Sequence, residues 1–284
     1  MLAVVLALVA AIGYGGSDFA AGMASRGAPV IRVALLGSVV SLVAVAATLP
    51  FAAGHLRPAA AALAWGAVAG LGGTGGALAL YLGFRQAAFS VAGPLSAVGA
   101  AGFCVLAGLL YGERPTALAL AGIVLALPAI VGVSASAARE EAGPKKAQGV
   151  GAGLIAGACF ALLFIGLDRA GSGSGLWPVA AAGTAEVISA FGVAAVTGNL
   201  RLPGGQPGWL AVITGLTGAA GTVSYFFATH EGFLAITAVL TSLYPAVTIV
   251  LARAVLGERL TRLRLAGLVL AAACVALIAA GGAG

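Results

Sequence analysis

The segment GERPTALALAGIVLA at residues 112–126 recurs as GERLTRLRLAGLVLA at residues 257–271, at an offset of 145 residues. Most positions of the two segments are identical. The register continues approximately upstream, where Tyr81 aligns with Tyr225 after a one-residue slip. Self-similarity at a long, fixed offset indicates an internal duplication, so we expect two homologous halves.

The composition places this duplicated chain in a lipid bilayer. Of its 284 residues, 61% are hydrophobic and 8% are charged, and the mean hydropathy is +1.12. An average soluble domain carries about 25% charged residues. The fourteen basic and eight acidic residues here are too few to cover a water-exposed exterior. Because the basic residues are scattered between apolar runs, they do not line a nucleic-acid groove, and we expect no nucleic-acid partner.

Apolar runs long enough to cross a bilayer follow one another along the chain. A helix needs about 20 residues to cross about 30 Å of hydrocarbon, and the period-2 alternation of a membrane barrel is absent. We therefore predict an all-α integral membrane protein with ten transmembrane helices. The predicted spans are residues 2–23, 30–51, 60–82, 88–111, 116–135, 149–167, 177–197, 209–229, 233–256 and 262–281.

These spans divide into five and five. We assign residues 1–138 to a first five-helix repeat, 139–148 to a linker and 149–284 to a second repeat. Because five is odd, the second repeat begins on the opposite side of the membrane, so the repeats are inverted. Inverted repeats are common in secondary transporters, which bind substrate near the midplane between them. The duplication supplies both halves within one chain, so we expect a monomer.

Three further motifs accompany this arrangement: GYGGSDF at residues 13–19, YPAV at 244–247 and LGERLT at 256–261. Together with the five-plus-five spans they resemble the EamA family of the drug/metabolite transporter superfamily, over nearly the whole chain. The resemblance implies a ten-helix carrier, often an exporter of amino acids, other metabolites or toxic small molecules. In the first half Ala101 stands at the position of Pro245, and Pro94 lies seven residues earlier, so we expect the halves to kink at different depths.

Two acidic residues fall inside predicted spans, where ionisable groups are costly and are functional candidates by default. Asp18 follows Tyr14 by four positions, which places both on one helix face. Glu186 lies near the middle of the seventh span, more than a dozen residues from the nearest charge. We interpret both acids as candidates for proton coupling. The structural alternatives are an interfacial Asp18 and a static ion pair of Glu186 with Arg32.

Small-molecule sites usually combine apolar walls with a few polar groups. The candidate substrate-binding residues on this basis are Tyr14, Asp18, Tyr81, Ser96, Phe160, Tyr225, Thr241, Ser242 and Tyr244. Each aromatic residue has packing as its alternative role. Pro245 leaves a carbonyl one turn earlier in the ninth span without its helical hydrogen bond, which makes that face of the span a better candidate for substrate binding.

Other conspicuous residues predict structural roles. Glu113, Arg114, Glu258 and Arg259 lie in the two Gly-Glu-Arg turns, where we expect them to fix the turn and hold the start of the next helix. The small residues of Gly66-xxx-Gly70 and of the glycines at 149, 153 and 157 predict close helix packing.

Neither a metal centre nor an enzyme active site is indicated. The three cysteines, Cys104, Cys159 and Cys274, are far apart in apolar runs, and His230 and Glu231 form one neighbouring pair that we expect at the membrane interface. We expect no metal, no cofactor and no catalytic activity.

The charge distribution bears on orientation. The predicted segments on the side of the termini hold three basic residues, Arg57, Arg114 and Arg169. The opposite side holds eleven: Arg26, Arg32, Arg85, Arg139, Lys145, Lys146, Arg201, Arg253, Arg259, Arg262 and Arg264. The positive-inside rule therefore places both termini outside, whereas the family resemblance implies termini in the cytoplasm, and both orientations stay open.

The sequence thus predicts a multi-pass carrier in the cytoplasmic membrane that moves small metabolites such as amino acids outward by alternating access. Coupling to protons through Asp18 or Glu186 is one interpretation. An uncoupled facilitator is the first alternative, and a non-transporting membrane scaffold is the second.

Overall fold

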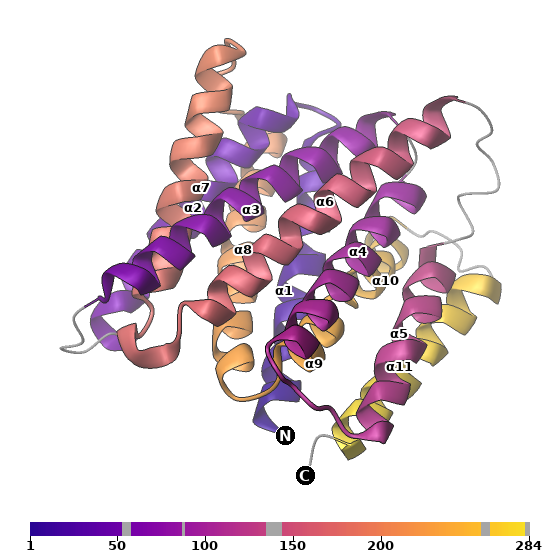
Figure 1. Cartoon of the computed structure of the whole chain (residues 1–284). Coiled ribbons are helices and arrows are strands. Elements are labelled where there is room, and N and C mark those ends of the chain that lie inside the picture. The colour runs from indigo at the N-terminus through magenta and orange to yellow at the C-terminus, as the bar shows by residue number, and fades with distance from the viewer. Residues whose placement is uncertain (53–57, 87–88, 135–143, 257–261, 282–284) are drawn as a thin grey trace.

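The computed structural model describes the chain outside residues 53–57, 87–88, 135–143, 257–261 and 282–284 (Figure 1). All regular structure in the described residues is helical. The helices are α1 (Leu2–Ala24), α2 (Val30–Ala52), α3 (Ala60–Gln86), α4 (Phe89–Leu110), α5 (Ala117–Ser134), α6 (Pro144–Arg169), α7 (Trp177–Val196), α8 (Gly205–His230), α9 (Leu234–Thr241), α10 (Tyr244–Leu256) and α11 (Arg262–Gly281), with a short 3-10 turn at Ser172–Ser174.

Seven segments of the described chain are long and apolar enough to cross a membrane. They are Leu2–Ala24, Val30–Pro50, Ala60–Gly83, Gly151–Arg169, Trp177–Val196, Gly205–His230 and Leu234–Leu256. Three shorter apolar helices, Leu95–Leu110, Ala117–Ile130 and Leu265–Gly281, complete the bundle. The large apolar side chains that remain exposed on these helices form a surface suited to lipid rather than to water.

The helix that contains Pro245 is divided. The sequence predicts one continuous span over residues 233–256, whereas the structure ends α9 at Thr241 and begins α10 at Tyr244. Proline has no N–H, and its ring displaces the carbonyl four residues earlier, here that of Thr241. In the first half α4 runs unbroken through Ala101, the residue that stands in place of Pro245.

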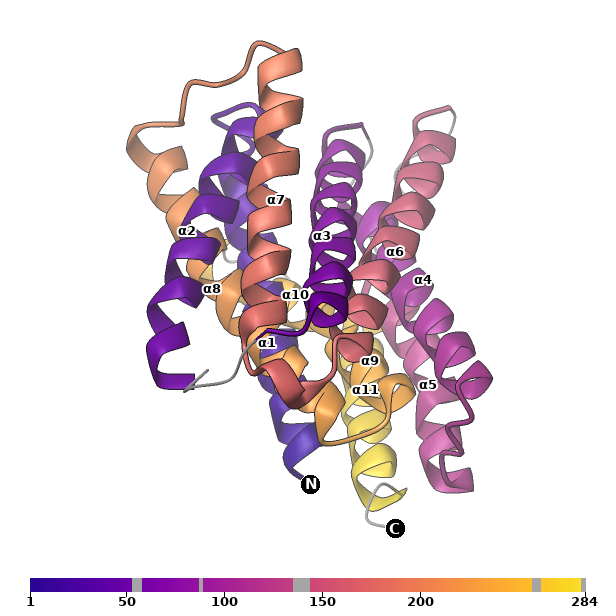
Figure 2. The same cartoon turned by 60° about the vertical axis from the view of Figure 1, so that its left-hand side comes forward.

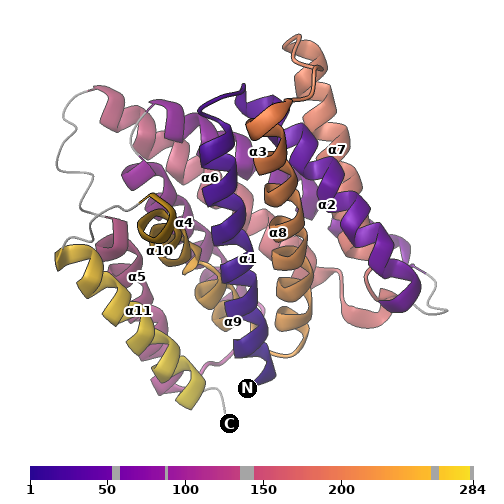
Figure 3. The same ribbon diagram turned by 180° about the vertical axis from the view of Figure 1, so that it is seen from behind.

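The two halves contact each other reciprocally. The most extensive contacts join α1 to α8, α3 to α6 and α5 to α11. In the second half, α6 corresponds to α1 and α8 corresponds to α3. The contact of α1 with α8 therefore corresponds to the contact of α6 with α3, and the two are related by the internal duplication. In Figures 1 and 3, α1 ascends from the N-terminus while α6 descends toward the turn before α7. The start of α1 and the end of α11 lie at the same end of the bundle (Figure 2).

Glycines allow this close approach between helices. A Cβ atom built on Gly13 of α1 would lie 2.7 Å from the Cα of Gly221 of α8. Gly66 and Gly70 bring α3 against the backbone of α7, and Gly157 brings α6 within 3.0 Å of Gly99 of α4 by the same measure. The packing role predicted for these small residues is therefore confirmed at Gly66, Gly70 and Gly157.

The first Gly-Glu-Arg turn departs from its predicted role. Glu113 follows α4, and its carboxylate accepts the backbone N–H groups of Leu234 (2.6 Å) and Ala235 (3.0 Å). Glu113 therefore holds the start of α9 in the second half rather than the start of the next helix, α5. Thr116 caps α5 instead, because its Oγ1 accepts the N–H of Ala119 at 3.2 Å. Arg114 is exposed, and Glu258 and Arg259 lie outside the described residues.

Candidate functional site

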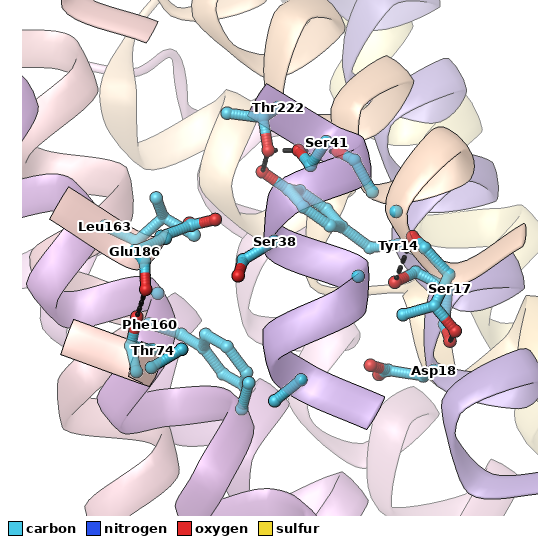
Figure 4. Close-up of a pocket in the computed structure, with 18 of the residues that line it drawn as sticks. Tyr14, Ser17, Asp18, Ser38, Ser41, Thr74, Phe160, Leu163, Glu186 and Thr222 are labelled. Carbon is cyan, nitrogen blue, oxygen red and sulfur yellow. Dashed lines mark hydrogen bonds between the residues drawn. The ribbon is translucent and has the colours of Figure 1, made fainter. Parts of the chain in front are cut away.

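A cavity of about 120 Å³ lies between helices of the two halves (Figure 4). A single water needs about 10–15 Å³, so the cavity has room for a small solute. It is lined by Tyr14, Ser17 and Asp18 of α1; Ala34, Gly37, Ser38 and Ser41 of α2; Gly73, Thr74, Ala77 and Tyr81 of α3; Phe160, Leu163 and Phe164 of α6; Glu186 and Ala190 of α7; Thr214, Gly215, Gly218 and Thr222 of α8; and Tyr244 of α10.

The cavity lies at mid-height in the bundle. Tyr14 is near the centre of α1, Glu186 is near the centre of α7, and Tyr244 stands at the break between α9 and α10. A ligand in this position would touch both halves and would lie about midway between the helix ends, which is where inverted-repeat proteins bind their substrates.

The structure brings six of the predicted site residues together. Five of the nine candidate substrate-binding residues line the cavity with Glu186: Tyr14, Asp18, Tyr81, Phe160 and Tyr244. Tyr14 is fixed in the wall, because its hydroxyl donates to Thr222 Oγ1 at 3.1 Å across the α1–α8 contact. Its ring also lies 6.0 Å from that of Phe164, centroid to centroid.

The other four candidates lie behind the wall. Ser96 is fully buried and its hydroxyl shares a 2.7 Å hydrogen bond with that of Tyr244. Tyr225 stacks on Phe164 and donates to the Phe164 carbonyl at 3.4 Å. Thr241 donates to the carbonyl of Ala7 in α1 at 3.4 Å.

Ser242 completes this group of four. Its residue is fully buried, and its Oγ has no hydrogen-bond partner among the described residues. It does not line the cavity. These four residues therefore support the wall or the helix break rather than facing the open space.

The two cavity carboxyl groups stand alone in the described part of the chain. Neither the Asp18 nor the Glu186 carboxylate takes part in a hydrogen bond or ion pair with another described residue. Arg32, the alternative partner of Glu186, instead donates from Nε to Asn199 Oδ1 at 3.2 Å. The static Arg32–Glu186 bridge considered from the sequence is therefore wrong. Asp18 lies in the cavity wall, inside α1 and not at its end.

Several hydroxyl groups in the cavity were not predicted. Ser38 and Ser41 of α2 and Thr74, Thr214 and Thr222 join the walls. The lining residues of α2 and of α8 follow one another at steps of one, three or four positions, so they fall on one face of their helix. They are residues 34, 37, 38 and 41 of α2 and residues 214, 215, 218 and 222 of α8. Small and hydroxyl side chains at such spacing define one face of each helix, but the sequence does not show which neighbour that face meets.

The remaining titratable residues lie elsewhere. No cluster of three or more His, Cys, Asp or Glu residues that could hold a metal ion occurs in the described part of the chain. His230 is at the end of α8, where its Nδ1 is 2.6 Å from the Phe226 carbonyl, and Glu231 is exposed beside it.

The EamA-like transporter family model matches residues 1–135 and 147–280, two copies that together span nearly the whole chain. The chain belongs to the EamA-like transporter family. Membership confirms the resemblance seen in the sequence, places the chain in the drug/metabolite transporter superfamily and identifies it as a multi-pass membrane transporter of small molecules.

A solved crystal structure, described only as "Crystal structure of protein", is similar in fold, with a TM-score of 0.79. The two sequences are 19% identical, and the match covers 99% of this chain and 97% of that one. No curated protein matches the sequence.

Proposed function

We propose that this EamA-like protein is a secondary transporter of the cytoplasmic membrane that moves small metabolites, such as amino acids, outward by alternating access. The observation that carries the proposal is the mid-height cavity between the two halves, whose walls hold two carboxyl groups without a partner among the described residues. A buried ionisable group without a protein partner is costly. Its retention is explained if it meets a solute or a proton during transport.

Alternating access fits the reciprocal contacts of the halves. We count α9 and α10 as one crossing, which gives ten spans in two inverted sets of five. Because the cavity takes walls from both halves, rocking of one half against the other would change which end of the cavity is open. One chain supplies both halves, so we propose that a monomer suffices.

The two acids are the proposed sites of proton coupling. Either carboxyl group can release its proton when a solute enters and take one up when the solute leaves. Such an exchange would connect solute movement to the proton gradient, and we propose that it needs no metal, cofactor or catalytic step.

The charge distribution supports an orientation with both termini outside. In the described chain Arg26, Arg32 and Arg201 lie at the end of the bundle opposite the termini, whereas Arg114 and Arg169 lie at the same end as the termini. Basic residues collect on the cytoplasmic side, so we propose that the end opposite the termini is cytoplasmic.

Flux into proteoliposomes tests the function. A panel of labelled amino acids and other small metabolites would be assayed with and without an imposed pH gradient, for the wild type, Asp18→Asn, Glu186→Gln and the exposed-acid control Glu231→Gln. We expect gradient-dependent flux in the wild type and the control, and loss of that dependence in Asp18→Asn or Glu186→Gln. Gradient-independent flux in all four proteins would instead establish a facilitator, and absence of flux for every compound would contradict the transporter proposal.

A further inference from the structure

The cavity is strongly one-sided in charge. Asp18 and Glu186 are its two acidic residues, and no lysine, arginine or histidine is among the described residues that line it. The remaining polar groups in the walls are hydroxyls of serine, threonine and tyrosine. A cationic group would therefore find both a countercharge and hydrogen-bond acceptors here, whereas an anionic group would find no countercharge among these residues.

Asp18 shares the cavity with three tyrosines. Tyr14, Tyr81 and Tyr244 come from three different helices and line the same space. A carboxylate among aromatic rings is a suitable site for an ammonium group, because the ring faces attract cations and the carboxylate supplies the opposite charge. A cavity of about 120 Å³ also admits only a compact solute.

Glu186 lies across the cavity from Asp18. In Figure 4 the two acids are on opposite sides, with Ser38 between them. The side chain of Glu186 lies against Gly73, where a Cβ atom would collide with its carboxyl oxygen. The two carboxyl groups thus occupy two separate positions in the cavity.

The helix end nearest the cavity does not provide a carboxylate site. Helix N-termini bind anions through free backbone N–H groups. At the start of α10, however, Pro245 has no N–H, and the N–H of Ala246 is already bonded to the Leu243 carbonyl at 2.9 Å. An amino-acid carboxylate would therefore meet two acids in the cavity, and neither Pro245 nor Ala246 offers it a free backbone N–H.

We propose that the cavity is selective for compact amines, that is, for solutes with an ammonium group and no carboxylate, and that the ammonium group binds at Asp18. This inference rests on the proposed transport function and narrows its substrates to amines, in place of the amino acids named there. Glu186 then serves as the proton-carrying acid on the opposite wall.

A set of three compounds with one aliphatic skeleton tests the selectivity. Leucine carries both an ammonium group and a carboxylate, isoamylamine carries only the ammonium group, and 4-methylpentanoate carries only the carboxylate. Binding of each to the purified full-length protein in detergent would be measured by calorimetric titration near neutral pH. A binding measurement is independent of flux, so the result does not depend on coupling or on the direction of transport.

We expect isoamylamine to bind at least about tenfold more tightly than leucine and 4-methylpentanoate to give no measurable binding. Asp18→Asn should weaken isoamylamine binding at least about tenfold, Asp18→Glu should restore part of it, and Glu231→Gln should leave it unchanged. Partial rescue by Asp18→Glu separates a direct charge contact from a fold defect.

Other outcomes would overturn the amine assignment. Tighter binding of leucine or 4-methylpentanoate would do so while leaving the transporter proposal intact, as would isoamylamine binding that survives Asp18→Asn. Absence of isoamylamine binding would also overturn it. Failure of flux for every solute in the proteoliposome assay would be the separate sign that the transport function itself is wrong.

Discussion

Glu113 and Leu234 lie 121 residues apart in the sequence, yet the Glu113 carboxylate accepts the Leu234 N–H at 2.6 Å. The second carboxylate oxygen accepts the N–H of Ala235 at 3.0 Å. The first N–H groups of a helix have no partner within it and carry the positive end of the helix dipole. A carboxylate from the first half thus caps α9 of the second half, near the end of the bundle that holds both termini.

This cap predicts a stability loss in Glu113→Gln. Glutamine has one acceptor oxygen, and its amide nitrogen would face an N–H donor, so one of the two hydrogen bonds is lost. We expect the free energy of unfolding to fall by about 0.5–2 kcal/mol, the usual effect of losing a helix cap. Thermal unfolding of the purified protein in detergent measures the change.

Glu231→Gln is the matched control for this substitution. Glu231 is an exposed glutamate at the end of α8, so its replacement should change the unfolding temperature little. Equal effects of the two substitutions would show that the Glu113 cap does not stabilise the fold.

The same residue predicts a pH dependence. Burial raises the pKa of the Glu113 carboxyl above its usual 4.5, and the charge of Asp168 adds to this, although the hydrogen bonds from Ala235 and Leu234 oppose it. With the folded-state pKa above the unfolded value, the folded protein binds this proton more tightly. The resulting stabilisation is fully present below the unfolded pKa and is lost as the pH rises through the raised folded-state pKa.

Unfolding temperatures of the wild type and Glu113→Gln over about pH 4 to 8 test this sign. The unfolding temperature of the wild type should exceed that of Glu113→Gln by less and less as the pH rises from the usual carboxyl pKa through the raised one. If the difference in unfolding temperature instead grows with pH over this window, the two backbone hydrogen bonds affect the Glu113 pKa more than burial does, and the expected sign is wrong.

Hydropathy alone predicted most helix positions, because each apolar run must be about as long as the bilayer is thick. The predicted spans at 2–23 and 30–51 differ by one residue from α1 and α2. The division of the ninth span was not predicted, although Pro245 marked its position. Hydropathy averages over a whole window and does not register a change in backbone hydrogen bonding at Thr241.

The cavity was predicted less completely than the helices. Asp18 and Glu186 could be identified because an acid inside an apolar run is costly to place in lipid and therefore stands out by residue type alone. Ser38 and Thr222 could not be identified in this way. Ser38 donates to the Leu35 carbonyl and Thr222 to the Gly218 carbonyl, each within its own helix, and such a bond can form on any face of a helix. Which hydroxyls face the cavity depends on how α2 and α8 pack against α1.

The Tyr14–Thr222 hydrogen bond predicts an interaction energy between these residues. Tyr14→Phe and Thr222→Val each remove the 3.1 Å bond while keeping most of the side-chain volume. In a double-mutant cycle on thermal stability we expect a coupling of about 0.5–1.5 kcal/mol. Tyr14→Phe with Thr197→Val, a residue on the exposed surface just past α7, should be additive. Additivity in both cycles would argue against a hydrogen bond that joins α1 to α8.

Gly70 and Gly73 lie three residues apart on α3 and predict opposite results for the same substitution. A Cβ at Gly70 would collide with the backbone of Ala182 in α7, which cannot move without separating the helices. A Cβ at Gly73 would meet only the end of the Glu186 side chain, which can rotate away within the cavity. Gly70→Ala should therefore destabilise the protein by about 1–3 kcal/mol, the usual cost of overpacking.

Gly73→Ala should keep the fold within about 1 kcal/mol of the wild type and should act on function instead, because it displaces Glu186 and narrows the cavity. The gradient-dependent part of solute flux into proteoliposomes should fall in this variant. Gly102 of α4 has no atom within 4 Å of a built Cβ, so Gly102→Ala controls for the change from glycine to alanine in a helix and should be neutral or slightly stabilising. Unchanged flux in Gly73→Ala would show that the position of the Glu186 carboxyl is not critical to transport, and would weaken the assignment of Glu186 as the proton-carrying acid.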